Sequence, residues 1–239
     1  MEVRRNLNPF VCKQFEIKHQ LSTLAVGTDA ILLASFTDCS NTNSIIDIGA
    51  GCGIIALALA QKCTPKACIE AIDLDKPSVI ESAENFKNSK WANQLKATHT
   101  SFLDWHGPLQ DLIVSNPPFF RNSLVNPSAH KQIARHQEDF SMIDFAQFCF
   151  SKSTAEGKIC IIYPASDQEY LITIFEHAGL FLSRVCTVYP KIKKEKSRIM
   201  IEFTKHITRT LYTELVVYDD DNKYTEEYKK FTKEYYLHF

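Results

Sequence analysis

A short apolar strand that leads straight into a glycine-rich turn and a helix constrains the fold of this chain more than any other feature. Ser44-Ile-Ile-Asp-Ile48 is typical of a buried strand, and a helical run from Ile54 to Gln61 begins directly after Gly53. Apolar strand segments and helical segments then alternate through most of the sequence. Because parallel strands need a crossover that is usually helical, this alternation predicts an α/β fold: a mostly parallel sheet with helices on both faces.

The remaining elements follow from the same patterns. A charged link at 191–196 joins the last two expected strands, which predicts a hairpin and one antiparallel strand near an edge of the sheet. Thr28 or Asp29 is expected to cap the first helix. We expect strands at 44–48, 67–72, 96–100, 109–115, 158–163, 181–189 and 198–204, and helices at 30–36, 54–61, 77–87, 141–153, 167–178 and 225–239.

Length and composition set the broad class. The chain of 239 residues suits a single domain, with residues 1–43 as a lead-in with a helix and residues 205–239 as an extension that packs on the core. No apolar run suggests a signal peptide or a membrane span, so a cytoplasmic location is expected. The eight cysteines include no CxxC pair, which predicts free thiols and no metal. Nothing in the sequence demands more than a monomer.

The glycine turn predicts a ligand site. Gly49, Gly51 and Gly53 allow the backbone to turn sharply and to approach a ligand closely. Similar turns also occur in nicotinamide-binding enzymes, so the glycines alone leave the ligand open. Asp47 favours one class of ligand, because a carboxylate would repel a pyrophosphate but would attract a ligand that carries an ammonium group.

Acidic residues also follow the next two expected strands. Asp73, with Leu74 beside it, stands where a carboxylate can bind both hydroxyls of a ribose, and Asp75 is the less suitable of the two acids. After the third strand, Phe102 and Leu103 are expected to flank an adenine, with Asp104 accepting from its amino group. The alternative is that these aspartates only cap the helices that follow.

The most specific motif ends the fourth strand, at Asn116-Pro-Pro-Phe119. The prolines fix the backbone, so that the Asn116 side chain and the Pro117 carbonyl can face one point. Two acceptors there would bind both N–H groups of a planar amine and aim its lone pair at an electrophilic methyl group. Phe119 would stack on the base, and Pro118 completes the turn. The alternative is a rigid proline turn that Asn116 merely caps.

Together, the glycine turn and the Asn116 motif resemble class I S-adenosylmethionine-dependent methyltransferases that act on N6 of adenine or N5 of glutamine. The chain more closely resembles the bacterial tRNA1(Val) (adenine-37-N6)-methyltransferase family over nearly its full length. The further matching segments are Phe10 to Phe15, Val26 to Leu33, Ala134 to His136, Tyr224 to Tyr228 and Tyr235 to Leu237.

This resemblance implies a seven-stranded Rossmann-like sheet with S-adenosylmethionine as cofactor. It implies that Thr28 and Asp29 close over the methionine end of that cofactor. Family members often have tyrosine where this chain has Phe119, and glutamate where it has Asp73; both replacements keep the chemistry.

A tRNA substrate is the partner that the resemblance implies. In the loop after the motif, Arg121, Lys131, Arg135 and His136 are candidate contacts to RNA phosphates. A second basic run, Lys191 to Arg198, is either another such contact or a solvated hairpin tip. Three alternatives stay open: a ribosomal RNA base amine, a glutamine amide of a protein, and a module that binds the cofactor without catalysis.

Overall fold

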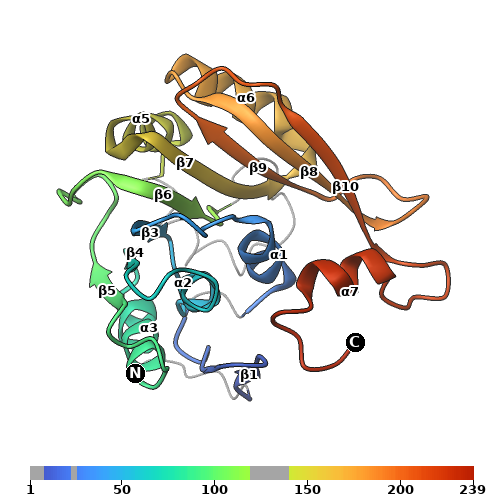
Figure 1. Ribbon diagram of the computed structural model, residues 1–239, viewed down its shortest axis with the longest axis horizontal. Coiled ribbons are helices and arrows are strands. Elements are labelled where there is room, and N and C mark those ends of the chain that lie inside the picture. The colour runs from blue at the N-terminus through green and yellow to red at the C-terminus, as the bar shows by residue number, and fades with distance from the viewer. Residues whose placement is uncertain (1–7, 23–25, 119–139) are drawn as a thin grey trace, which may run out of the picture.

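An eight-stranded sheet forms the centre of the molecule in the computed structural model, which describes residues 8–22, 26–118 and 140–239 (Figure 1). Its strand order is β10-β8-β9-β7-β6-β3-β4-β5. The strands are β3 (Ser44–Ile48), β4 (Cys68–Asp73), β5 (Leu95–His99), β6 (Gln110–Ser115), β7 (Ser153–Pro164), β8 (Phe181–Lys191), β9 (Arg198–Thr204) and β10 (Leu211–Tyr218).

The predicted α/β class and its mostly parallel sheet are confirmed, and β9 is antiparallel to both of its neighbours as the hairpin prediction required. The predicted count of seven strands is one too low. Strand β10, which had no place in the prediction, pairs in parallel with β8 and lies at the edge of the sheet. A small second sheet pairs β1 (Phe10–Val11) with β2 (Glu16–Ile17).

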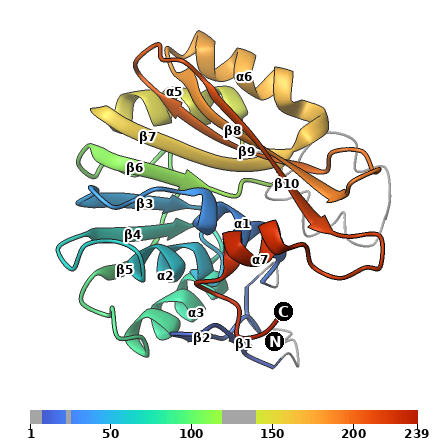
Figure 2. The same cartoon turned by 45° about the vertical axis from the view of Figure 1, so that its right-hand side comes forward.

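Helices cover both faces of the sheet (Figure 2). Alternating strand residues point to opposite faces and form two separate cores, so that Ile45 and Val114 belong to one core while Ile46 and Ile113 belong to the other. The first core contains residues of α1 (Thr28–Phe36), α2 (Ile54–Ala60), α3 (Lys76–Lys87) and α7 (Glu226–Thr232). The second contains residues of α5 (Met142–Lys152) and α6 (Gln168–His177), and α6 follows the short 3-10 helix η1 (Ala165–Asp167).

The predicted helix at 225–239 is too long. Helix α7 ends at Thr232, and the residues after it leave the helix to pack against α2 and the N-terminal segment. The Tyr235 hydroxyl donates to the Ala58 carbonyl at 3.1 Å, and the Tyr235 carbonyl accepts from the Lys13 N–H at 2.9 Å. These bonds hold the two ends of the chain together beside α2.

The predicted cap of α1 is also wrong. The N-cap is Gly27, no side chain caps the helix, and Thr28 and Asp29 occupy its first turn. The Asp29 carboxylate instead forms an ion pair with Arg198, 2.9 Å from Nε to Oδ2. None of the helices within the described residues is long and apolar enough to cross a membrane.

Candidate active site

Three parallel strands bring most of the predicted site residues together at the edge of the sheet that the carboxyl ends of the strands form. Ile48 at the end of β3 pairs with Ile72 of β4 on one side and with Ser115 of β6 on the other. The residues at or directly after the ends of these strands, among them Gly49, Asp73 and Asn116, therefore lie side by side. With neighbouring strands about 4.8 Å apart, the three strand ends lie within roughly 10 Å of one another.

The glycine turn combines an open part and a packed part. Gly49, Gly51 and Gly53 all have positive φ angles, of 70°, 55° and 83°. A Cβ atom added to Gly49 or Gly51 would meet nothing within 4 Å, whereas one added to Gly53 would lie 2.5 Å from the Phe86 ring. The open space beside the first two glycines is room for a ligand, and Gly53 is required by helix packing.

Asp47 lies fully buried beneath this turn. One carboxylate oxygen accepts the Ala56 N–H at 3.2 Å, and the other is buried without a hydrogen-bond partner among the described residues. The pKa of Asp47 is raised to about 7, mainly by burial; the Ala56 N–H opposes the rise, and the charge of Asp73 contributes to it. An unpaired buried carboxylate oxygen is costly unless a partner reaches it, and an ammonium group bound above the turn would be such a partner.

Asp73 and Asp75 have different roles at the end of β4. The Asp73 carboxylate accepts the N–H of Gly51 with one oxygen and that of Asp75 with the other, both at 2.8 Å. A carboxylate oxygen can accept more than one hydrogen bond, which is the property that binding a ribose hydroxyl requires. Asp75 is the N-cap of α3, where it accepts from the Ser78 N–H and hydroxyl. The capping interpretation thus applies to Asp75. Leu74 between them is 47% exposed.

The segment after β5 lies next to Asp73, whose carbonyl accepts the Thr100 N–H at 3.1 Å. Leu103 is 52% exposed, and Asp104 is exposed with a carboxylate that bonds to none of the described residues. Phe102 differs, because its ring is 5% exposed and makes edge contacts with three phenylalanines, Phe140, Phe145 and Phe148. Core packing accounts for this ring, and its contact with an adenine stays a prediction.

A hydrogen bond fixes the position of Ser115, the residue directly before the Asn116 motif. The Ser115 hydroxyl donates to the Ile48 carbonyl at 2.8 Å, which ties the ends of β6 and β3 together. Asn116 Oδ1 is buried and has no hydrogen-bond partner within the described part of the chain. Pro117 is buried and Pro118 exposed. Phe119 and the four candidate RNA contacts, Arg121, Lys131, Arg135 and His136, lie outside the described residues.

The buried polar face of α3 is a functional feature that the sequence interpretation missed. Glu81 accepts the backbone N–H groups of Gln20, Leu21 and Ser22, and also the Ser22 hydroxyl. Asn85 donates to the Cys52 carbonyl in the glycine turn and to the Lys18 carbonyl, both at 2.9 Å. The helix thus holds the segment before α1 against the glycine turn. The spacing of Ser78, Glu81 and Asn85, three and four residues apart, was the available signal, but an ordinary solvated helix face has the same spacing.

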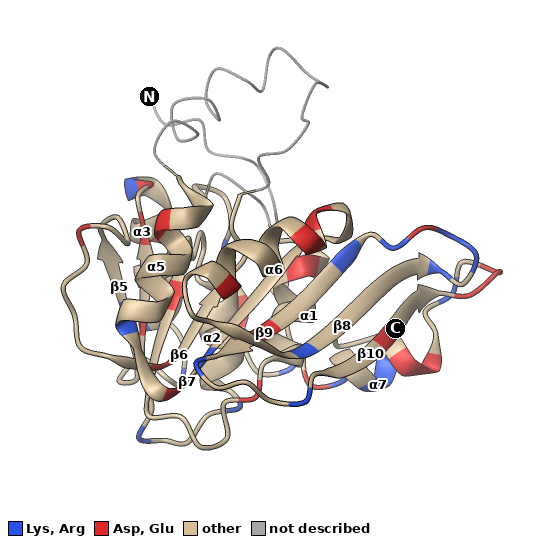
Figure 3. Ribbon diagram, turned by 90° about the horizontal axis from the view of Figure 1, so that it is seen from above, with Lys and Arg blue, Asp and Glu red and all other residues tan. Residues whose placement is uncertain are grey.

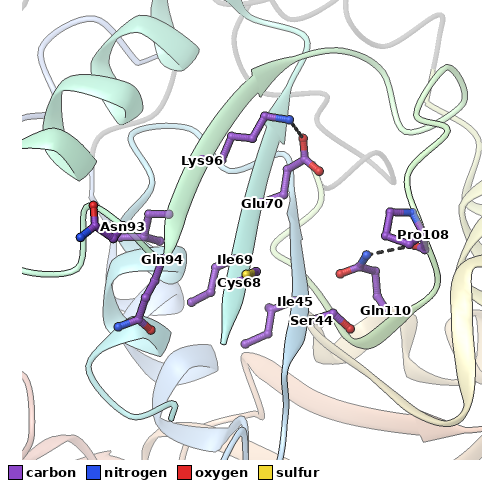
Figure 4. Close-up of a pocket in the computed structure, with 11 residues that line it drawn as sticks. Ser44, Ile45, Cys68, Ile69, Glu70, Asn93, Gln94, Lys96, Pro108 and Gln110 are labelled. Atoms are coloured by element: carbon purple, nitrogen blue, oxygen red, sulfur yellow. Dashed lines mark hydrogen bonds and ion pairs between the residues drawn. The ribbon is translucent and has the colours of Figure 1, made fainter. Parts of the chain in front are cut away.

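The pocket in Figure 4 is a separate feature at the amino ends of the strands, opposite the candidate active site. It is lined by the first residues of three strands, Ser44, Cys68 and Gln110, and by Glu70. The Glu70 carboxylate is already engaged by Lys96, Thr98 and Trp105, at 2.9, 2.6 and 3.1 Å. The carboxylate of this pocket is therefore held by structural contacts, whereas the Cys68 thiol is free and exposed. Over the described ranges, no group of three or more histidine, cysteine or acidic residues has a geometry that holds a metal.

Comparison with known proteins gives a family match and close relatives. Residues 22–140 match the family model of the methyltransferase small domain. A tRNA1(Val) (adenine(37)-N6)-methyltransferase of Actinobacillus succinogenes is 34% identical over 97% of this chain and 98% of its own length. A protein of the same name from Tolumonas auensis is 32% identical over 95% and 96%.

Solved structures show the same fold at low sequence identity. A predicted O-methyltransferase from Agrobacterium tumefaciens has a TM-score of 0.66 and 15% identity, and the similarity covers 87% of this chain and 96% of that one. A putative RNA methyltransferase from Pyrococcus horikoshii has a TM-score of 0.54 and 17% identity over 82% and 93% of the two chains.

Proposed function

The chain belongs to the tRNA1(Val) (adenine(37)-N6)-methyltransferase family, and from this premise we propose that it transfers the methyl group of S-adenosylmethionine to N6 of adenine 37 in tRNA1(Val). One observation at the site carries most weight beside the family: the buried Asn116 Oδ1, which has no partner among the described residues, stands at the same sheet edge as the open glycine turn. An acceptor without a donor, next to a ligand cradle, fits the binding of a substrate N–H group.

The residues at the sheet edge fit the cofactor. Asp47 has a buried oxygen that no described residue bonds, which suits the methionine ammonium, and Gly49 and Gly51 have open space beside them. We assign the ribose hydroxyls to the Asp73 carboxylate, which the N–H groups of Gly51 and Asp75 orient. We assign the adenine to Leu74, Leu103 and Asp104, with Phe102 behind them, and the methionine end also to Thr28 and Asp29. When bound, S-adenosylmethionine supplies an electrophilic methyl group on a sulfonium.

The chain's own part in the reaction is to hold the acceptor nitrogen. The lone pair of an adenine amino group is delocalised into the ring, which makes the nitrogen a poor nucleophile. We assign one N–H to Asn116 Oδ1 and the other to the Pro117 carbonyl, which favours a pyramidal nitrogen and aims its lone pair. The proton leaves after transfer, when the nitrogen is cationic. In this proposal Phe119 stacks on the base and Pro118 keeps the turn rigid.

The substrate is an anticodon loop, where a base can leave the stack at modest cost. Arg121, Lys131, Arg135 and His136 remain our proposed contacts to its phosphates, since they follow the catalytic motif directly. We propose that residues 1–239 act as one catalytic domain, that the enzyme works as a monomer, and that it works in the cytoplasm, where tRNA is modified.

The test is methyl transfer to an unmodified tRNA1(Val) transcript and to the same transcript with guanine at position 37. We expect N6-methyladenosine in the first RNA only, identified by nucleoside mass spectrometry after digestion. Equal methylation of both transcripts would overturn the assignment of the nucleotide. Methylation of glutamine in proteins, or of ribosomal RNA alone, would replace this function by one of the alternatives.

A further inference from the structure

We propose that the tip of the β8–β9 hairpin, residues 191–196, is a phosphate-binding arm that holds the tRNA beside the active site. The proposal rests on the function proposed above and adds a surface to it. The tip carries four lysines, Lys191, Lys193, Lys194 and Lys196, and one acid, Glu195, in a chain whose net charge is −1. Positive charge is thus concentrated at one short segment.

The register of the sheet puts this arm on the side of the active site. Ser115 of β6 pairs with Ile161 of β7, which pairs with Ile201 of β9. Ile201 in turn pairs with Val185 of β8, so one row of residues crosses the sheet at the level where the Asn116 motif begins. Because β9 is antiparallel to both β7 and β8, β8 runs in the same direction as β7 and β6. The end of β8 and the start of β9 therefore leave this row toward the edge that holds Asn116.

The arm also reaches well beyond that edge. From Val185, β8 continues for six residues to Lys191, and at about 3.3 Å per residue this is roughly 20 Å. Between β6 and β8 lie only β7 and β9, a lateral distance of about 14 Å at 4.8 Å per strand. The hairpin therefore projects at one side of the catalytic edge, at a distance that the backbone of an RNA with its loop bound at Asn116 can span.

The lysines of the tip have no carboxylate partner among the described residues. Lys191 Nζ is 3.5 Å from the Asp220 carbonyl, and Lys196 Nζ is 3.4 Å from Gln168 Oε1. Lys193 and Lys194 are exposed, and neither side chain bonds to any part of the chain that the structure describes. Elsewhere lysines do meet acids, as Lys18 meets Glu84, Lys96 meets Glu70, Lys158 meets Asp38 and Lys229 meets Glu226.

An acidic turn lies beside the arm, but among the described residues it forms no ion pair with the arm lysines. Figure 3 shows the basic residues between β8 and β9 next to the acidic turn that follows β10. The Asp219 carboxylate in that turn accepts the N–H groups of Asp221 and Lys223, so it stabilises the turn itself. The lysines repel one another, and an anion bound among them relieves that repulsion. Phosphate is the anion that the proposed substrate presents along its whole backbone.

The tip suits RNA better than it suits a protein partner. Ile192, 67% exposed, is its one large apolar side chain, which is too little for the apolar centre that a stable protein interface needs. Lysine contacts to phosphate fix the position of a nucleic acid without reading its sequence. The arm is therefore expected to raise affinity for the RNA and to leave the choice of nucleotide to the Asn116 motif.

The test compares two double variants of equal charge. In the arm variant, Lys193→Gln and Lys194→Gln remove two positive charges from the arm. In the control variant, Lys66→Gln and Lys87→Gln remove two positive charges from exposed positions near the amino ends of the strands. Binding of the unmodified tRNA1(Val) transcript is measured over a range of salt concentrations. For the arm variant we expect the slope of log K against log salt to fall by roughly 1.5, and the KM for tRNA to rise roughly fivefold.

The expected control result is a slope and a KM close to those of the unaltered enzyme, with cofactor affinity and kcat unchanged in both variants. Equal salt slopes and equal KM values for the arm variant and the unaltered enzyme would overturn the arm while methylation of tRNA still supports the proposed function. An unaltered enzyme that neither binds nor methylates the transcript would overturn the proposed function, and the arm with it.

Discussion

The N–H of Gly51 donates a 2.8 Å hydrogen bond to the Asp73 carboxylate, and this bond joins the glycine turn to the end of the neighbouring strand. The two residues are 22 positions apart in sequence. The carboxylate also accepts the Asp75 N–H, so it is oriented before any ligand arrives. Orientation in advance lowers the entropy cost of binding, which is why this aspartate is the proposed ribose ligand.

Replacing Asp73 is expected to weaken cofactor binding. Asp73→Ala removes the acceptor for the ribose hydroxyls and frees the glycine turn, so the Kd for S-adenosylmethionine should rise about tenfold or more, as the loss of charged hydrogen bonds implies. Isothermal titration calorimetry measures it. Asp75→Ala is the matched control, because loss of the α3 cap should lower the free energy of unfolding by about 1 kcal/mol and leave the Kd nearly unchanged. An unchanged Kd for Asp73→Ala would exclude the ribose role.

The glycine turn predicts two different effects of alanine. Gly51→Ala meets open space, so the variant should fold with a cost of about 1–2 kcal/mol for its positive φ, but its methyl group should block the ligand. Gly53→Ala brings a Cβ atom to 2.5 Å from the Phe86 ring and should destabilise the fold more strongly. Thermal unfolding and cofactor titration separate the two. Equal loss of stability with intact binding in both variants would contradict the division of the turn.

Asn116→Ala should abolish methyl transfer while the cofactor still binds. The substitution removes the buried acceptor oxygen that is proposed to hold the adenine amino group. Loss of one preorganised group of this kind lowers kcat by about 100- to 1,000-fold. Single-turnover methylation of the tRNA1(Val) transcript gives the rate, and calorimetry on the same variant gives cofactor affinity. A variant with nearly normal turnover would show that Asn116 only supports the proline turn.

Local patterns were enough to predict seven of the eight strands, because each of these shows its own apolar pattern, whereas β10 was missed. The strand over 44–48, the glycine turn and the helix from 54 agree with β3, the positive φ angles and α2. The end of α7 was mispredicted because the contact that unwinds it, Tyr235 with Ala58, is 177 residues away in sequence. The Asp29 cap failed for the same reason, since its carboxylate meets Arg198 at a separation of 169 residues.

The candidate site, like the fold, was predicted only where the signal is local in sequence. Short motifs predicted which residues gather at the sheet edge, because parallel strands bring their carboxyl ends together. They did not reveal that Glu81 and Asn85 hold the segment before α1, since a buried polar face and a solvated one have the same spacing on a helix. They also left open whether the basic hairpin contacts RNA or is only a solvated tip. Only the register of β8 and β9 indicates that it points toward the catalytic edge.

Asp47 makes the stability of the free enzyme depend on pH. Burial raises the pKa of Asp47 to about 7, far above the value near 4 of an unfolded carboxyl group. The folded state therefore favours the protonated acid, and the stability that this provides is complete below about pH 4 and lost as the pH rises to about 7. Asp47→Asn carries no such charge and should not lose stability over this range. Urea unfolding of both proteins from pH 4 to pH 8 tests this, and parallel curves would contradict it.

The same carboxyl group predicts that cofactor binding releases protons. An ammonium group beside the free Asp47 oxygen favours the ionised form and lowers its pKa, so a proton leaves as the ligand enters. Release should be largest near pH 6, where the free enzyme is mostly protonated at Asp47, and should vanish near pH 8. Calorimetry in buffers of different ionisation enthalpy counts the protons. Asp47→Asn should lose this release near pH 6, and an identical proton count in that variant would show that the ligand ammonium does not meet Asp47.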